Sequence, residues 1–450
     1  MKYKPFLIIC FIIILSHINA NAQNPIIRNQ FSADPTARVF NGKVYLYPSH
    51  DIKTPEGKNL RKDWFCMADY HVFSSDNLTD WTDHGVIVSQ NKVKWVDSTS
   101  YSMWAPDCAE RNGKYYFYFP ANTNQVGTNN RKGFGIGVAI AEKPEGPYIP
   151  QEEPIKGVPG IDPNVFIDKD GQAYLIWAMG RISIAKLKDN MLELASEPQD
   201  IKDLPSKGMK EGPFMFERNG IYYMTYPHVE NTIERLEYAI ADNPMGPFKF
   251  AGVIMDEATN GCWTNHQSIV QFKDQWYLFY HQNDWSPKFD KNRSVRIDSL
   301  FFNADGTIQK VKPTLRGVGL TKATDKIQLD RYSRISDKGA TITYNDTLEY
   351  FEGWKTILSL ENAQIQYNSV DFGAGNYKSI EIRYLSPKGG ALTLIQNSKN
   401  GKAECKIKIP TSAKWTTARI KVSGIIAGIQ NLTLSNAGNN PVEIDWISFK

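Results

Sequence analysis

Short runs in which apolar and polar residues alternate make up most of the chain, and a period of two is that of β-strands. Five segments repeat one arrangement, an apolar run, a tight turn and a tyrosine-rich run; they begin at Arg38, Ala109, Val165, Met215 and Ile269. In four of them the turn is Asn-Gly or Asp-Gly, which a type I′ hairpin favours because both central residues need a positive φ. The fifth copy has Lys-Asp-Gln and is the weakest. The pattern predicts five antiparallel hairpins.

A second hairpin-like stretch follows the copies, as at 71–84, 138–148 and 238–248. Two hairpins make a four-stranded sheet, and the unit recurs at intervals of roughly 50 to 70 residues, a repeat typical of β-propellers. No helical period competes with this interpretation. We therefore expect an all-β fold with a five-bladed β-propeller over residues 26–318.

The C-terminal part of the chain, residues 326–450, carries alternating strands without this repeat. Examples are 379–384, 391–395 and 405–409, with Gly, Asn and Pro turns between them. A chain of 450 residues is also too long for one ordinary core. The prediction is a second domain, a β-sandwich of the jelly-roll type.

The N-terminus has the pattern of a secretory signal peptide. Lys2 and Lys4 precede an apolar run at 6–15, and Ala20-Asn21-Ala22 supplies small residues for cleavage. We expect residues 1–22 to be removed and the protein to be exported, to the periplasm or the extracellular space. No later stretch is apolar and long enough to span a membrane.

Charge and cysteine content narrow the classes of function. The formal net charge of +4 becomes +2 once Lys2 and Lys4 are removed, which gives no electrostatic case for binding nucleic acid. The remaining cysteines stand singly, without the spacing of a zinc site or a disulfide framework, and we expect buried free thiols; they are Cys66, Cys108, Cys262 and Cys405.

Acidic residues precede the first hairpins of three repeats at similar distances. Asp34 lies eight residues before Gly42, Asp162 nine before Gly171, and Glu211 nine before Gly220. His266 has the corresponding place in the fifth repeat, eight residues before Asp274. Because the first strands of propeller blades surround one central channel, this spacing predicts three carboxyl groups and a histidine at one end of the channel.

Such a cluster suits the hydrolysis of a glycosidic bond. Neighbouring carboxylates raise the pKa of at least one member, and the reaction needs one protonated and one ionised carboxyl group. A longer Glu211 would reach the leaving oxygen, whereas a shorter Asp34 leaves room for a water, the inverting arrangement. For each aspartate taken singly, the Asp-Pro pairs at 34–35 and 162–163 have another explanation as turn starts.

The chain resembles family 43 glycoside hydrolases over nearly all of residues 26–315. Seven motifs in order carry the resemblance: Ala33-Asp34-Pro35, Tyr47-Pro48-Ser49-His50-Asp51, Met103-Trp104-Ala105-Pro106-Asp107, Gly160-Ile161-Asp162-Pro163, Glu211-Gly212-Pro213, Trp263-Thr264-Asn265-His266 and Arg293-Ser294-Val295. Each motif is short, and their order and phasing make the set specific.

The resemblance implies roles for these residues. Asp34 is the general base, Glu211 the general acid, and Asp162 orients Glu211 and keeps its pKa raised. The sugar-binding residues would be Arg293, which contacts the sugar, Asp34 or Asp162, together with Trp104, Trp263 and Asp51. His266 holds a water-coordinated calcium in such enzymes, or is a hydrogen-bonded core histidine. No cofactor is required for the chemistry.

The C-terminal part resembles family 6 carbohydrate-binding modules. The matching residues are Val370-Asp371-Phe372-Gly373, Trp415-Thr416-Thr417 and the run 444–449. The aromatic residue usual before the first motif is missing from 361–365, so a structural cap and a sugar-binding module both remain open. Asp330 and Asp445 fall where that family has a structural calcium.

The expected activity is exo-acting release of pentoses, α-L-arabinofuranose or β-D-xylose, from plant hemicellulose such as arabinoxylan. Residue chemistry does not separate the two sugars, because the same carboxyl groups serve both. The alternatives are an exo-galactosidase or endo-arabinanase of the same fold, or a non-catalytic glycan-binding propeller. The expected partner is a plant polysaccharide or oligosaccharide.

Overall fold

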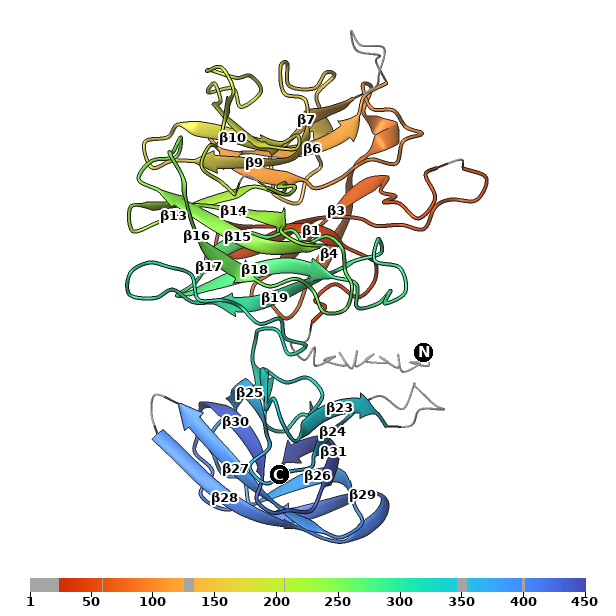
Figure 1. Ribbon diagram of the computed structural model, residues 1–450, viewed down its shortest axis with the longest axis vertical. Coiled ribbons are helices and arrows are strands. Elements are labelled where there is room, and N and C mark those ends of the chain that lie inside the picture. The colour runs from red at the N-terminus through yellow and green to blue at the C-terminus, as the bar shows by residue number, and fades with distance from the viewer. Residues whose placement is uncertain (1–23, 59, 125–132, 206, 346–353, 399–400) are drawn as a thin grey trace, which may run out of the picture.

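A computed structural model describes residues 24–450 except 59, 125–132, 206, 346–353 and 399–400 (Figure 1). Nearly all regular structure in this part of the chain is β-strand, with one short 3-10 helix at Gln90–Lys92. The predicted signal peptide lies outside the described residues. Among those described, no helix has the length and apolarity needed to cross a bilayer.

Four antiparallel sheets of four strands and one of three form the N-terminal part of the protein. The first two sheets contain β1 (Ala33–Phe40), β2 (Lys43–Ser49), β3 (Asp69–Ser75) and β4 (Thr82–Ser89), then β5 (Asp107–Arg111), β6 (Lys114–Asn122), β7 (Phe134–Ala141) and β8 (Ile149–Pro150). The next two contain β9 (Ile161–Ile167), β10 (Ala173–Ala178), β11 (Ile182–Lys186) and β12 (Gln199–Asp200), then β13 (Phe214–Arg218), β14 (Ile221–Val229), β15 (Glu234–Ala241) and β16 (Lys249–Met255). The last contains β17 (Ser268–Phe272), β18 (Gln275–Gln282) and β19 (Ser294–Leu300).

The first strands of the five sheets close a ring. β1 packs against β5, β5 against β9, β9 against β13, β13 against β17, and β17 against β1. This arrangement is a five-bladed β-propeller with its first strands around the axis, as predicted. The tyrosines that recur in the sequence fill the spaces within and between blades, since Tyr47, Tyr118, Tyr226 and Tyr280 are all fully buried.

The three inner hairpins with Asn-Gly turns have the geometry that the sequence indicated, whereas the Asp170-Gly171 turn does not, because only Gly171 has a positive φ there. Asn41 and Gly42 have φ of 51° and 75°, and Asn219 and Gly220 have 53° and 83°. Positive φ at both central residues is that of a type I′ turn. In the fifth hairpin Lys273 takes the first position with a φ of 55°, which a lysine adopts at some steric cost.

The fifth blade differs from the expected four-stranded unit. Its sheet stops at β19, and the chain around residue 24 covers the outer edge of that strand. The Ile26 N–H donates to the Val295 carbonyl at 2.9 Å, and the Asn24 amide exchanges two hydrogen bonds with the backbone of Ile297. The N-terminal segment therefore completes the last blade at the edge where the other blades have a fourth strand of their own.

Two six-stranded sheets form the C-terminal part, drawn in blue in Figure 1. One contains β20 (Thr321–Lys322), β22 (Arg334–Ile335), β25 (Gln364–Asp371), β27 (Gly390–Ser398), β28 (Gly401–Ile409) and β30 (Ile429–Asn436). The other contains β21 (Ile327–Gln328), β23 (Ala340–Tyr344), β24 (Trp354–Leu358), β26 (Ser379–Ser386), β29 (Ser412–Lys421) and β31 (Val442–Phe449). A single apolar core that includes Ile382, Leu394, Leu434 and Phe449 lies between them, as in a β-sandwich.

All four described cysteines are free thiols, as expected, but their burial is not uniform. Cys66, Cys108 and Cys262 are buried, whereas Cys405 is half-buried on β28. The expectation of burial is wrong for Cys405, because it lies near the outer edge of the sandwich.

Candidate active site

Two aspartates are aimed into the propeller channel by irregular backbone at the start of β1 and β9. Asp34 and Asp162 have positive φ, 45° and 54°, which is uncommon for residues other than glycine. Strand pairing shifts register at the same points, between Ala33 and Thr36 and opposite Ile176 to Ala178. Bulges of this kind re-aim side chains and are frequent at active sites. The Asp-Pro pairs are thus turn-like and also direct carboxyl groups into the channel.

Glu211 reaches the same place by a different local route. In the fourth blade the positive φ, 50°, falls on Gly212, eight residues before Gly220 as Asp34 is before Gly42. Glu211 stands one residue earlier and its N–H donates to the Pro227 carbonyl at 3.4 Å. Spacing alone did not reveal this offset, which gives Glu211 a direction of its own.

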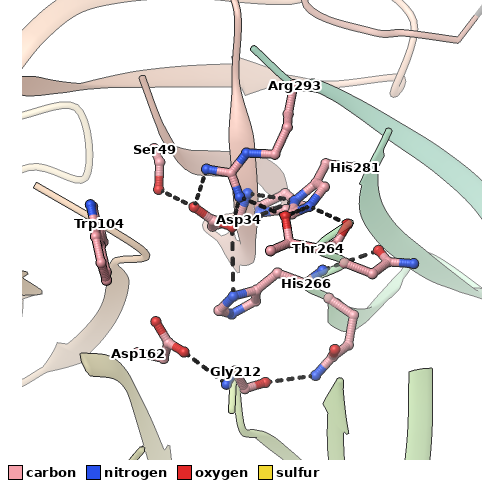
Figure 2. A network of polar contacts seen from close by, with 12 residues as sticks. Asp34, Ser49, Trp104, Asp162, Gly212, Thr264, His266, His281 and Arg293 are labelled. Carbon is pink, nitrogen blue, oxygen red and sulfur yellow. Dashed lines mark hydrogen bonds and ion pairs between the residues drawn. The ribbon is translucent and has the colours of Figure 1, made fainter. Parts of the chain in front are cut away.

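Arg293 fixes the position and charge of Asp34 (Figure 2). Its Nη1 and Nη2 donate to the two Asp34 oxygens at 2.8 and 3.1 Å, and Ser49 Oγ donates to Oδ2 at 2.6 Å. Burial alone would raise the pKa of Asp34, but the Arg293 guanidinium, His281, His266 and the Ser49 hydrogen bond together outweigh it and lower that pKa to about 2. Asp34 is therefore a carboxylate at any pH near neutral.

His281 holds the backbone of Asp34, and the sequence interpretation did not include it. The Asp34 N–H donates to His281 Nδ1 at 3.1 Å, and His281 Nε2 donates to the Thr264 carbonyl at 3.0 Å. These bonds require the neutral ring with its proton on Nε2. Burial, followed by the charge of Arg293, lowers the pKa of His281 to about 3, in agreement with that tautomer.

The pKa values of Asp162 and Glu211 are raised, whereas that of Asp34 is lowered. The Gly212 N–H donates to Asp162 Oδ2 at 2.9 Å, so Asp162 anchors the residue that follows Glu211 (Figure 2). Burial, and then the charge of Glu211, raises the pKa of Asp162 well above its usual range. Burial also raises the pKa of Glu211, and the charge of Asp34 adds to the rise.

The pocket that joins Asp34, Asp162 and Glu211 is walled by aromatic side chains. Trp104 and Trp263 line it, as predicted, and so do Trp64 and Phe65, which the sequence interpretation missed. Its volume is about 650 Å³ with the open mouth included. That size is typical of small-ligand sites, and a sugar ring offers C–H faces to such walls.

Phe65 contacts three of the groups that shape the pocket. Its ring lies 6.0 Å from Trp104 and 6.4 Å from Trp263, and the Arg293 guanidinium lies 4.8 Å from its centroid. Phe65 comes from the long connection between β2 and β3, where no repeat marks its place. No signal in the sequence could have identified it.

Asp51 does not lie where a sugar contact requires. Its two oxygens accept hydrogen bonds from Arg293 Nε at 2.9 Å and Nη2 at 3.0 Å, and the side chain is absent from the lining of the pocket. Asp51 is 1% exposed. The expected substrate contact is corrected to a role behind Arg293, whose orientation it fixes. Arg293 itself donates hydrogen bonds to Asp34, and among the described residues it forms no hydrogen bond or ion pair with Asp162.

His266 lies in the pocket, with Nδ1 at 3.8 Å from Asp34 Oδ1. Burial is the main cause that lowers its pKa to about 4, so the ring is neutral. Calcium takes six to eight oxygen ligands, and the groups of three or more metal-binding side chains among the described residues do not include His266. No cage of protein ligands surrounds His266 among the described residues, and a calcium at His266 with water as its other ligands stays a prediction.

The two aspartates expected to bind calcium in the C-terminal part, Asp330 and Asp445, are paired with arginines instead. Arg331 Nε lies 2.9 Å from Asp330 Oδ2, and Arg383 contacts Asp445. Each carboxylate thus has an arginine partner, and neither belongs to a group of metal-binding side chains within the described residues.

The site has one carboxylate held ionised and a second carboxyl with a raised pKa, in a pocket with aromatic walls at the centre of a propeller. These are the groups that an enzyme needs to hydrolyse glycosidic bonds. Residues 22–308 match the family model described as glycosyl hydrolases family 43, and residues 334–450 match that of the carbohydrate binding module, family 6. The chain belongs to glycosyl hydrolase family 43.

Characterised proteins of this family are similar to most of the chain. A xylosidase/arabinosidase 43A of Humicola insolens is 38% identical over 64% of this chain and 99% of its own length. An arabinoxylan arabinofuranohydrolase of Bacillus subtilis (strain 168) is 29% identical over 89% of this chain and 86% of its own. The crystal structure of CoXyl43, a GH43 β-xylosidase/α-arabinofuranosidase from a compost microbial metagenome, in complex with xylotriose and in calcium-free form, has a TM-score of 0.58 at 35% identity, covering 65% of this chain and 98% of that one.

Proposed function

We propose that the protein is an exo-acting, inverting glycoside hydrolase that releases α-L-arabinofuranose or β-D-xylose from hemicellulose such as arabinoxylan. The observation that carries the proposal is that two carboxyl groups in one pocket have pKa values shifted in opposite directions. The pKa of Asp34 is lowered, so Asp34 is ionised, and the pKa of Glu211 is raised. The inference that the released sugar is a pentose rests on the relatives, which are named as a xylosidase/arabinosidase and an arabinoxylan arabinofuranohydrolase.

Asp34 acts as the general base. A water on one face of the sugar gives its proton to the Asp34 carboxylate as its oxygen bonds to the anomeric carbon. Arg293 and Ser49 hold both Asp34 oxygens, and His281 holds its backbone, so the carboxylate is aimed before substrate arrives. This preorganisation lowers the cost of reaching the transition state.

Glu211 acts as the general acid on the opposite face. It gives its proton to the glycosidic oxygen as the bond to the anomeric carbon breaks. Asp162 positions Glu211 through the Gly212 N–H, whereas burial and the charge of Asp34 keep the pKa of Glu211 raised. The walls formed by Trp104, Trp263 and Phe65 suit the apolar faces of a single terminal sugar.

Two further proposals concern the rest of the chain. The pattern at 1–22 supports export of the protein to the periplasm or beyond. The C-terminal sandwich is proposed to be a structural cap to the enzyme and not to hold a second sugar site at Trp415. The Arg383 guanidinium lies 4.9 Å from the centroid of that ring, where a sugar would have to stack.

Replacement of the two proposed catalytic groups tests the function. Glu211→Gln and Asp34→Asn should each lower kcat on arabinoxylan oligosaccharides by about 10²-fold or more, the range for general acid–base catalysis. On 4-nitrophenyl α-L-arabinofuranoside and 4-nitrophenyl β-D-xyloside, Glu211→Gln should lose less, because nitrophenolate leaves with little protonation. Proton NMR of the first product should show inversion at the anomeric carbon. Retained activity of either variant on oligosaccharides, or a retained configuration, would contradict the proposal.

A further inference from the structure

A fourth carboxyl group, that of Glu234, lies behind Glu211. Glu234 begins β15 and is 1% exposed. Its N–H donates to the Trp263 carbonyl at 3.0 Å, and its Oε2 accepts the Asn265 N–H at 2.6 Å. Both bonds tie it to the segment just before His266, so the carboxyl group is fixed in orientation.

The other carboxyl oxygen of Glu234, Oε1, has no hydrogen-bond donor in the part of the chain that the structure describes, and the neighbouring group with which it can share a proton is Glu211. Within the described residues no donor reaches Oε1, which is fully buried. The carboxyl groups of Glu211 and Glu234 are within hydrogen-bonding reach of each other. Two carboxyl oxygens approach in this way only if a proton lies between them, because a buried carboxylate with one N–H partner is costly.

We propose that Glu234 is a positioning residue that keeps its own proton and donates a hydrogen bond from Oε1 to the carboxyl group of Glu211. The proposal rests on the function of Glu211 as general acid. When Glu211 gives its proton to the leaving oxygen, the new carboxylate accepts the Glu234 hydrogen bond and is stabilised. Glu234 neither loses nor gains a proton in the step, and the water proton goes to Asp34.

The surroundings of the pair agree with this division of roles. Burial, and then the charge of Glu211, raises the pKa of Glu234 well above its usual range, with a further rise from Asp162. For Glu211, burial and the charge of Asp34 raise the pKa, whereas the Glu234 hydrogen bond and Arg293 lower it. The proton is therefore held more firmly on Glu234 than on Glu211, which suits a donor beside an acid that must release its proton.

Two substitutions separate a neutral donor from a charged group. Glu234→Gln replaces the carboxyl by an amide of the same shape, which can donate to Glu211 and still accept the Asn265 N–H. Glu234→Met keeps similar volume but removes the donor. The probes are an arabinoxylan oligosaccharide, whose leaving group needs protonation, and 4-nitrophenyl α-L-arabinofuranoside, whose leaving group does not.

Glu234→Met should lower kcat on the oligosaccharide by about 10- to 100-fold, with a much smaller loss on the nitrophenyl glycoside. Without the donor, ionised Glu211 is less stable, its pKa rises, and the basic limb of the kcat/KM profile moves to higher pH. Glu234→Gln should restore both the leaving-group dependence and the position of the basic limb. The matched control is Glu237→Gln, which alters an equally buried carboxyl on β15 that faces Arg235 and His228; its basic limb should not move.

The proposal is overturned if Glu234→Met keeps the profile of the unaltered enzyme, or if Glu234→Gln moves the basic limb to lower pH, since that shift would mean Glu234 is ionised. Should the Met variant fail to fold, infrared spectra at neutral pH decide, because Glu234→Gln must remove one protonated-carboxyl carbonyl band. An unchanged band pattern would overturn the proposal. If Glu211→Gln itself remains active on oligosaccharides, the proposed function fails instead.

Discussion

At the scale of single residues, the charge of Asp34 depends on one side chain. Arg293 is 2% exposed and reaches Asp34 and Asp51 with three nitrogens at once, a planar fork that lysine cannot reproduce. Burial raises the pKa of Asp34, and Arg293 is the largest of the causes that lower it. The low pKa therefore depends strongly on the geometry of Arg293.

Arg293→Lys should move the acidic limb of kcat/KM to higher pH. The lysine makes fewer contacts with Asp34, burial remains, and the pKa of Asp34 therefore rises above about 2, by roughly one to two units. Because Asp34 must be ionised, activity is lost first at acidic pH. The basic limb, set by Glu211, should stay in place. The measurement is a pH profile on an arabinoxylan oligosaccharide.

The matched control for this prediction is Arg296→Lys. Arg296 is also buried on β19, but its Nε donates to Asp284 at 3.0 Å, and among the described residues it forms no hydrogen bond or ion pair with Asp34. Its acidic limb should remain where it is in the unaltered enzyme. A uniform fall of the Arg293→Lys profile at every pH would contradict the argument, since it would show that positioning alone was lost.

The sequence revealed Asp34, Asp162 and Glu211 because hairpin turns mark the chain at known distances from them. It did not reveal Glu234, which lies on a third strand without such a mark, or Phe65, which lies on a long connection. It also placed Asp51 in the sugar site, because a motif shows that residues are needed and does not show which of them faces the pocket. Burial behind Arg293 is a tertiary property.

At the scale of elements, the segment just before β13 carries the acid on a constrained backbone. Gly212 has a φ of 50°, and a Cβ there would lie 2.9 Å from Pro227 Cδ and 3.1 Å from His266 Cε1. The adjacent Glu211 and the Asp162 hydrogen bond both depend on this turn. The corresponding residues of blades one and three, Asp34 and Asp162, have a positive φ with a side chain, whereas at Gly212 the close approach of Pro227 and His266 leaves no room for one.

Gly212→Ala should lower kcat by about 10-fold or more, because a displacement of about 1 Å at a catalytic group can cost 10²-fold. The control is Gly220→Ala in the hairpin turn of the same blade, where φ is 83° and no atom lies within 4 Å of the added Cβ. The alanine at this positive φ costs about 1–2 kcal/mol of stability, and the variant should keep kcat. Thermal melts and kcat on an oligosaccharide separate the two; equal kcat losses would contradict the argument.

At the scale of the whole molecule, the propeller ring is closed by two segments that are far apart in the sequence, residues 24–26 and β19. The hairpin repeat predicted five blades, since each blade is largely local. The outer edge of the fifth blade was not predictable in the same way, because residues 24–26 form no hairpin and pair with β19 across the whole propeller. The same closure touches the exit toward the sandwich, where the Asn24 N–H donates to the Leu315 carbonyl at 3.1 Å.

Asn24→Ala should destabilise the propeller without a large change in kcat. The side chain is 1% exposed; Nδ2 donates to the Ile297 and Thr314 carbonyls at 3.0 and 2.8 Å, and Oδ1 accepts the Ile297 N–H at 2.9 Å. Leaving a buried polar group without its partner costs about 1–3 kcal/mol. Asn29→Ala, which removes an exposed bond to Asp83, is the control and should leave the melting temperature nearly unchanged. Equal melting temperatures for the two variants would show that the N-terminal segment does not hold the ring closed, because Asn24, unlike Asn29, joins β19 to the segment at Thr314 that leads out of the blade.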